Sequence, residues 1–421
     1  MPWPWPRPAC WPRSWSWRGS PDMACGAQPP SPRGDPCRAS APACCAPAPN
    51  ALAEVSPRFA HMTDHALERV RAAKAAGQPV VGILCEFTPR ELILAAGGVP
   101  VCLCGGAHAM IAPAEVDLPA NLCPLIKSTY GYHLTRSNPF LEMCDLVVAE
   151  TTCDGKKKMY ELMGETRPMH VLQLPSRSDE VSRTLWRHEV RRLHAALQER
   201  FARPISEADL RAAIITMETE RAARRDLAGL MRGERTPLTG RQVLELRSLA
   251  SGDPADLAEY QRINAAPPEP RHSGVRVLLT GVPVPHGAEK VVDLIEGHGG
   301  LIVAHEHCSG LKPLEIRIDA QAADPLTAIA DAYLHLPCSV MTRNDGRLDL
   351  IRRLAGDFRA QCVVELVWQA CLTYDVEAVR VKRLCADLGL PYLRIGTDYA
   401  PGDTARIAVR LEALFEQVQA A

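Results

Sequence analysis

The sequence predicts an α/β fold with two doubly wound parallel sheets, of the Rossmann or flavodoxin type, and a helical insert between them. Short apolar runs rich in β-branched residues alternate with helical segments towards both ends of the 421-residue chain, as in parallel sheets covered by helices. The middle of the chain has helical periodicity without such runs. We expect an N-terminal extension (1–61), an N-terminal α/β domain (62–175), a helical segment with a linker (176–272) and a C-terminal α/β domain (273–421).

The N-terminal α/β domain opens with Pro79–Leu84, an apolar run typical of a strand buried on both faces. The next segment, Thr88–Glu91, predicts a helix with an N-cap threonine, a proline at its first position and a capping-box glutamate. A glycine pair, Gly97-Gly98, ends that helix. Further strands are expected at Val99–Leu103, Leu146–Ala149 and His170–Leu174.

The remaining elements follow the same two patterns. Helices are predicted over Glu180–Phe201, Ser206–Leu230 and Thr239–Leu249, with a capping box at Ser206–Asp209, and a Pro-rich linker over residues 265–270. Strands are predicted at Arg276–Val282, Leu301–His305, Cys362–Val367 and Tyr392–Ile395, before a terminal amphipathic helix, Thr404–Val418. The two α/β halves resemble a distant duplication, although no residue-level repeat proves it.

The first 50 residues carry no periodicity, and they hold five of the seven tryptophans among many prolines. They lack the continuous apolar stretch of a secretory signal. We therefore expect residues 1–61 to be a disordered extension or the product of a start codon assigned too far upstream, with Met23 and Met62 as alternative starts.

Composition and missing motifs exclude several classes of protein. The chain has 48 Lys and Arg against 49 Asp and Glu, which argues against nucleic-acid binding. No apolar run approaches the ~20 residues of a membrane-spanning helix, and we expect a cytoplasmic protein. The chain has no P-loop motif and no GxGxxG before a helix, so we do not expect it to bind ATP in a P-loop.

The sixteen cysteines are the most informative feature of the composition. No CxxC occurs, which disfavours a ferredoxin run, a zinc ribbon and a thioredoxin motif. Parallel sheets bind ligands beyond the carboxyl ends of their strands. Six cysteines lie at such ends or in loops beside a proline: Cys85, Cys123, Cys153, Cys308, Cys338 and Cys371. Thiolates from both sides of the cleft between the two sheets favour an iron–sulfur cluster.

Other interpretations compete at several of these positions. The cysteines within or beside strands and helices are expected to act as small hydrophobic residues: Cys102, Cys104, Cys144, Cys362 and Cys385. Cys104 is the least certain of these, because Gly105-Gly106 would let the backbone approach a ligand closely. His305, His307 and Cys308 could instead form part of a zinc site, although no fourth ligand has a matching spacing. Lys156–Lys158 could contact phosphate or coenzyme A, dock an acidic partner or simply begin a solvated helix.

Several segments carry a family resemblance that covers about residues 60–420. Cys85–Pro100, Asn121–Pro124 and Cys153–Tyr160 resemble the 2-hydroxyacyl-CoA dehydratase and benzoyl-CoA reductase family. In the second half, Pro337–Asn344, Trp368–Tyr374 and Gly396–Tyr399 resemble its double-cubane-cluster branch.

The resemblance implies an anaerobic, homodimeric reductase in which six cysteines hold two bridged [4Fe–4S] cubanes, [Fe8S9]. A separate iron–sulfur ATPase, the activator, would supply low-potential electrons for the reduction of a small molecule. The alternatives are a 2-hydroxyacyl-CoA dehydratase subunit with one [4Fe–4S] cluster and a non-catalytic iron–sulfur electron carrier.

The same resemblance implies that Cys123, Cys153 and Cys371 hold one cubane, which leaves Cys85, Cys308 and Cys338 for the second. The duplication would instead group the cysteines by half of the chain. Both partitions stay open from the sequence.

Overall fold

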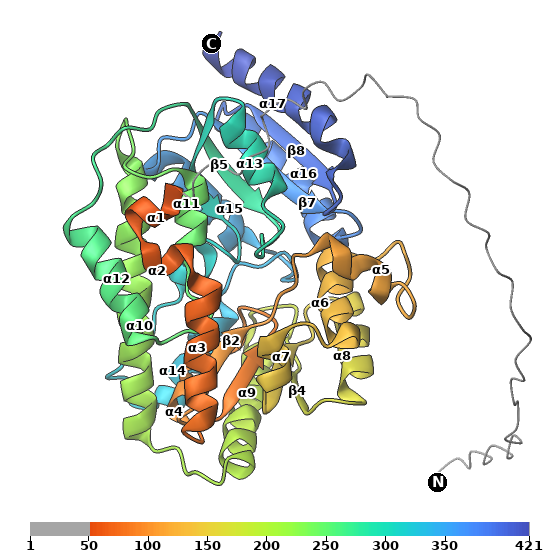
Figure 1. The fold of residues 1–421 in the computed structure, drawn as a ribbon, viewed down its shortest axis with the longest axis vertical. Helices are drawn as coiled ribbons and strands as arrows, with labels where there is room; N and C mark the ends of the chain where they lie inside the picture. Colours follow the sequence, from red (N-terminus) through yellow and green to blue (C-terminus); the bar gives the residue numbers. More distant parts are fainter. Residues whose placement is uncertain (1–50, 421) are drawn as a thin grey trace, which may run out of the picture. The chain divides into compact units, whose positions relative to one another are not determined.

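Two parallel four-stranded sheets organise residues 51–420, the part of the chain that the computed structural model describes (Figure 1). The first sheet contains β1 (Val80–Ile83), β2 (Val99–Cys102), β3 (Leu146–Glu150) and β4 (Met169–Leu172) in the order β2-β1-β3-β4. The second contains β5 (Val275–Gly281), β6 (Gly300–Glu306), β7 (Cys362–Trp368) and β8 (Tyr392–Thr397) in the order β6-β5-β7-β8. All neighbouring strands pair in parallel, which confirms the predicted fold class.

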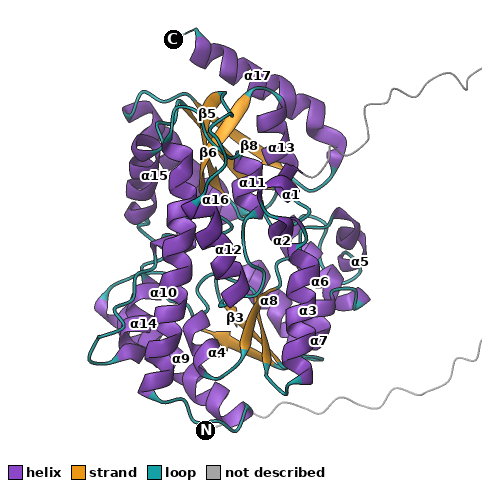
Figure 2. Ribbon diagram, turned by 60° about the vertical axis from the view of Figure 1, so that its left-hand side comes forward, coloured by secondary structure: helices purple, strands orange, loops and turns teal. Residues whose placement is uncertain are grey.

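The strand orders of the two sheets correspond position for position, and Figure 2 shows the sheets as two separate groups of strands. In each sheet the first strand lies between the second and the third, so the chain changes direction across the sheet at that point. Ligands of open parallel sheets bind at such switch points. The halves therefore share a topology, and each presents a potential ligand edge where β1 and β3, or β5 and β7, end.

The helices of the first half are α3 (Met62–Ala75), α4 (Arg90–Ala95), α5 (Ile111–Ala114), α6 (Pro124–Thr135), α7 (Pro139–Met143) and α8 (Asp154–Gly164). The predicted cap of α4 is wrong, because the helix begins at Arg90 without a side-chain cap. Thr88 instead donates a hydrogen bond to buried Glu150, and Glu91 accepts one from Tyr333 at 2.8 Å. Tertiary contacts thus use both side chains of the expected capping box.

The helical middle contains α9 (Glu180–Arg200), α10 (Glu207–Gly229), α11 (Gly240–Glu245) and α12 (Pro254–Ala265). The capping box at the start of α10 is confirmed, with Ser206 and Asp209 as its partners. The sequence did not indicate α12 as a helix. These helices pack against both halves, since α10 contacts α4 as well as α14 (Pro325–Leu334).

The second half adds α13 (Lys290–Gly297), α15 (Asp345–Asp357), α16 (Leu372–Asp387) and α17 (Thr404–Gln419). Helix α14 follows β6 in the chain but packs beside the first sheet. The Trp186 indole N–H of α9 donates to the Ala330 carbonyl at 3.0 Å, and Ile329 and Tyr333 share a buried cluster with Val81 of β1. The chain therefore crosses back to the first sheet before it reaches Cys338.

Short helices precede α3, namely α1 (Ala51–Val55) and α2 (Pro57–Ala60). Phe59 is buried, and its ring lies 4.8 Å from that of Tyr260 in α12. The described part of the expected extension, residues 51–61, is thus helical and packed, while residues 1–50 lie outside the described residues. Among the described helices, none combines the length and the apolar character needed to cross a membrane.

Candidate functional site

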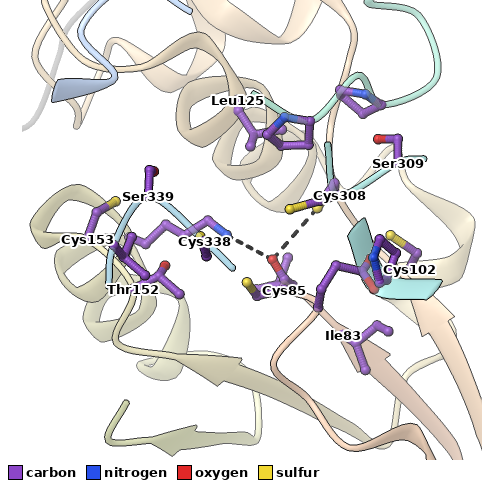
Figure 3. A pocket seen from close by; sticks show the side chains of 18 of the residues that line it. Ile83, Cys85, Cys102, Leu125, Thr152, Cys153, Cys308, Ser309, Cys338 and Ser339 are labelled. Atoms are coloured by element: carbon purple, nitrogen blue, oxygen red, sulfur yellow. Dashed lines mark hydrogen bonds between the residues drawn. The ribbon is translucent and has the colours of Figure 1, made fainter. Parts of the chain in front are cut away.

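A cavity of about 860 Å³ lies where the carboxyl ends of both sheets meet (Figure 3). Its wall contains Cys85 after β1, Cys153 after β3, Cys308 after β6 and Cys371 after β7. Figure 3 shows Cys85, Cys153, Cys308 and Cys338 around one space. The ligand edge expected of each sheet is therefore part of a single cavity.

Eight cysteines line this cavity. They include all six predicted site residues, Cys85, Cys123, Cys153, Cys308, Cys338 and Cys371, together with Cys102 and Cys104. The other three described cysteines, Cys144, Cys362 and Cys385, do not line it. Burial raises the pKa of each of these three thiols to about 12, as expected of packing residues.

Cys123, Cys153 and Cys371 share one local geometry. Each occupies the N-cap position of a helix, α6, α8 and α16 respectively. Burial is the largest cause that raises the pKa of Cys153, and backbone N–H groups at the helix starts act in the opposite direction on all three thiols, as does the positive end of a helix dipole. A hydrogen bond from Cys371 is the largest cause that lowers the pKa of Cys123 and correspondingly raises that of Cys371.

Cys85, Cys308 and Cys338 form a second neighbourhood. Burial raises the pKa of Cys85 well above its usual value, and the charges of Cys308 and Cys338 add to this effect. Burial likewise raises the pKa of Cys308 to about 12, again with a contribution from Cys338. The electrostatic neighbours of these three thiols therefore come from both halves of the chain.

Cys102 and Cys104 were expected to be packing residues, and their place in the cavity wall differs from that expectation. Cys102 is the last residue of β2, and Cys104 follows it two residues later, just past the end of the strand. A hydrogen bond between the two side chains lowers the pKa of Cys102 to about 6 and raises that of Cys104. The spacing of two residues between Cys102 and Cys104, at the carboxyl end of a predicted strand, was the sequence signal that could have identified this pair.

The glycine pair after Cys104 serves the protein's own packing. A Cβ atom at Gly105 would lie 2.7 Å from the Thr129 backbone nitrogen, and one at Gly106 would lie 2.0 Å from the His286 carbonyl oxygen. The close approach expected of these glycines is thus made to other backbone segments, one of them in the second half.

The three lysines of the Lys156–Lys158 stretch have different environments. Lys156 lines the cavity, and its ammonium donates to the Leu84 carbonyl at 2.9 Å. Burial opposes its charge, but Tyr160 and the cavity thiols outweigh this and raise the pKa of Lys156. Lys157 and Lys158 are exposed and pair with Asp154 and Glu161 on their own helix. Of these three lysines, Lys156 is therefore the one that can balance negative charge inside the cavity.

The histidines of the alternative zinc site do not line the cavity. One ring nitrogen of His305 lies 2.8 Å from the Gly240 carbonyl oxygen, and the other lies 3.2 Å from His307. Within residues 51–420, no three His, Cys, Asp or Glu side chains converge as ligands of one ion. A cubane places fewer demands on convergence, because each thiolate binds a different iron atom.

Comparisons with known proteins point to one family. The model of the 2-hydroxyglutaryl-CoA dehydratase D-component matches residues 85–418. YjiM of Escherichia coli (strain K12), which is named as a dehydratase subunit, is 40% identical over 364 residues, 82% of this chain and 93% of the relative. The (R)-phenyllactyl-CoA dehydratase beta subunit of Clostridium sporogenes is 22% identical, with 81% and 92% of the two chains covered. A benzoyl-CoA reductase subunit of Thauera aromatica is also 22% identical, with 75% and 84% covered.

Proposed function

Because the chain belongs to the 2-hydroxyglutaryl-CoA dehydratase D-component family, we propose that it is a reductase with a double-cubane [Fe8S9] cluster. It receives low-potential electrons from a separate iron–sulfur ATPase and reduces a small molecule. The observation that carries this proposal is the set of eight thiols around one cavity, drawn from both sheets. A subunit that bound a single cubane through three cysteines would leave most of these thiols without a role.

The donor set fits the proposed cofactor. Soft thiolates from several chain segments are the usual ligands of iron–sulfur clusters. Most of the electrostatic contacts support the partition in which Cys123, Cys153 and Cys371 hold one cubane, and Cys85, Cys308 and Cys338 the other; the contact between Cys153 and Cys338 joins the two sets. When bound, the cluster would supply electrons of low potential to the substrate.

The chain's own residues set the electrostatics of the cavity. The raised pKa values of Cys85 and Cys308 mean that these thiols must release protons when they bind metal, so cluster binding depends on pH. The Lys156 ammonium and three helix N-termini then oppose the accumulated negative charge. Ala370 holds a φ of 59° directly before Cys371, which is a strained conformation for a residue with a Cβ atom.

A second candidate is a 2-hydroxyacyl-CoA dehydratase subunit with one [4Fe–4S] cluster. The dehydratase names of two relatives favour it. Such a subunit would require a second, different subunit and would bind an acyl-CoA, whereas the reductase proposed here works as a homodimer. A third candidate, an electron carrier, would accept electrons without converting a substrate.

Iron analysis of anaerobically purified protein tests the proposal. We expect about eight iron atoms per chain, since each cubane contributes ~4. About four iron atoms would favour the dehydratase alternative, and zinc without iron would contradict both.

Cysteine variants then test the individual ligands. Cys123→Ala, Cys153→Ala or Cys371→Ala should lose most of the iron, because each removes a thiolate from a shared cluster. The matched controls Cys362→Ala and Cys385→Ala lie outside the cavity and should keep their iron at a packing cost of ~0.5–3 kcal/mol. Cys85→Ala should lose iron while Cys104→Ala retains it. Iron loss in the Cys104 variant alone would show that Cys104, rather than Cys85, is the ligand.

A further inference from the structure

One part of the cavity wall carries arginines instead of thiols. Four guanidinium groups line it, those of Arg90, Arg221, Arg224 and Arg247. Two of them have carboxylate partners at close range. Arg90 pairs with Glu86 at 2.8 Å, and Arg221 pairs with Glu218 at 2.7 Å and also with Glu91. These two arginines are neutralised within the protein.

Arg247 lacks such a partner. The residue is only 9% exposed, and its hydrogen bond within the protein runs to the Val284 carbonyl at 2.8 Å. Among the described residues, no carboxylate forms an ion pair with its guanidinium. Burial is the largest cause that lowers the pKa of Arg247; the charges of Cys102 and Glu289 act against it, and the charge of Arg224 adds to it. None of these negative groups forms a close ion pair with the guanidinium, so most of its N–H donors are left for an acceptor in the cavity.

Arg224 is the second arginine of this part of the wall that has no carboxylate at close range. Its closest carboxylate is an oxygen of Glu220 at 3.9 Å, and the other oxygen of Glu220 accepts a hydrogen bond from the Gly252 backbone at 2.8 Å. The Arg224 side chain is 19% exposed and lines the same cavity. Two guanidinium groups, one from α10 and one from the loop after α11, thus retain N–H donors for a further acceptor.

The surroundings indicate what kind of anion fits. A guanidinium fork matches a planar carboxylate in a bidentate geometry. Met217, Leu249 and Leu314 line the cavity and offer apolar surface for a short carbon chain. The Glu220 carboxylate lies close by and would repel a phosphate dianion more strongly than a carboxylate monoanion.

We propose that Arg224 and Arg247 form a subsite for the carboxylate of a small organic acid, which places the rest of that molecule in the thiol-lined part of the cavity. The identification of this acid as the substrate rests on the proposed function. The binding of the carboxylate itself requires no cluster.

Calorimetric titration of the full-length, anaerobically purified protein with acetate tests the subsite, with acetamide and inorganic phosphate as comparison ligands. Acetate should bind, and uncharged acetamide should bind at least tenfold more weakly. Arg247→Met and Arg224→Met should each weaken acetate binding at least tenfold. Arg225→Met is the matched control on the same helix, because Arg225 does not line the cavity and contacts the Leu314 carbonyl. It should leave acetate binding unchanged.

Arg224→Lys keeps the charge without the fork and should lose less affinity than Arg224→Met, so the subsite stays testable if Arg247→Met fails to fold. Acetate affinity that is equal in wild type, Arg224→Met and Arg224→Lys would overturn the proposal. Tighter binding of phosphate than of acetate, or equal binding of acetamide, would do the same. Iron measured in the same samples separates the two proposals: acetate binding without iron leaves the subsite standing and contradicts the cluster, whereas iron without acetate binding contradicts the subsite.

Discussion

Arg347 occupies the centre of a buried ion network beneath the cysteine loops of the second half. Its guanidinium donates to Glu377 at 2.7 Å, to Glu365 at 3.0 Å and to Glu306 at 3.2 Å. Lys312 adds a second cation, 3.1 Å from Glu306. Arg347→Met would keep most of the side-chain volume while leaving three carboxylates with one cation.

The expected loss of stability follows from this arrangement. Removing one partner of a buried ion pair typically destabilises a protein by about 3–5 kcal/mol, because the remaining charge is desolvated and uncompensated. Burial already raises the pKa of Glu365, and Arg347 counters that effect. Without Arg347, Glu365 should take up a proton more readily, so the loss of stability at pH 7 should shrink as the pH approaches 5.

Urea unfolding of the reduced, iron-free protein, followed by far-UV circular dichroism, measures the effect. Arg352→Met is the matched control on the same helix, because its pair with Asp349 at 2.8 Å is solvent-exposed and should contribute less than about 1 kcal/mol. Lys312 also donates to the Tyr374 hydroxyl at 3.0 Å, and Tyr374 lines the cavity, so iron content should fall with stability in the Arg347 variant. A loss no larger than that of Arg352→Met would refute the reasoning.

Two further predictions concern the N-terminus and the first sheet. Deletion of residues 1–50 should leave stability and iron content unchanged. Deletion of residues 1–61 also removes the buried Phe59, so it should cost at least the ~3–5 kcal/mol of a lost core aromatic. Equal urea midpoints for the two truncations would contradict this prediction. Burial, with a smaller effect of Arg192, lowers the pKa of His170 from 6.5 to about 4. The unfolded chain therefore binds more protons between these values, so stability should fall as the pH drops from about 6.5 to 4. His170→Gln should flatten that part of the plot of unfolding free energy against pH. Superimposable wild-type and variant plots would show that His170 has no such effect.

The sequence predicted the strands well because most of them are short, buried apolar runs, as in β1, β3, β5, β6 and β7. Pro79–Leu84 contains the observed β1, and Arg276–Val282 lies within one residue of β5. The likeness of the two halves, by contrast, is visible in the strand order and not in the residues, since buried strands constrain hydrophobicity and not residue identity.

The sequence was least informative where tertiary contacts override local patterns. Thr88 has the right position for an N-cap, yet its hydroxyl serves Glu150 on a neighbouring strand. The return of α14 to the first sheet depends on contacts with α9, such as that of Trp186 with Ala330, and a local pattern cannot encode such a contact. The pair Arg224 and Arg247 was missed for the same reason, because one lies on α10 and the other in the loop after α11, and the sequence offers no reason to combine them.

The two thiol neighbourhoods also bear on how a duplicated fold could hold one bridged cofactor. Cys123 and Cys153 come from the first half, and their neighbour Cys371 comes from the second. Cys308 and Cys338 come from the second half, and their neighbour Cys85 comes from the first. Grouping by half would separate Cys371 from Cys123 and Cys85 from Cys308, whereas the other partition would separate Cys153 from Cys338, which also raises its pKa. Under that partition neither half could complete a cubane alone.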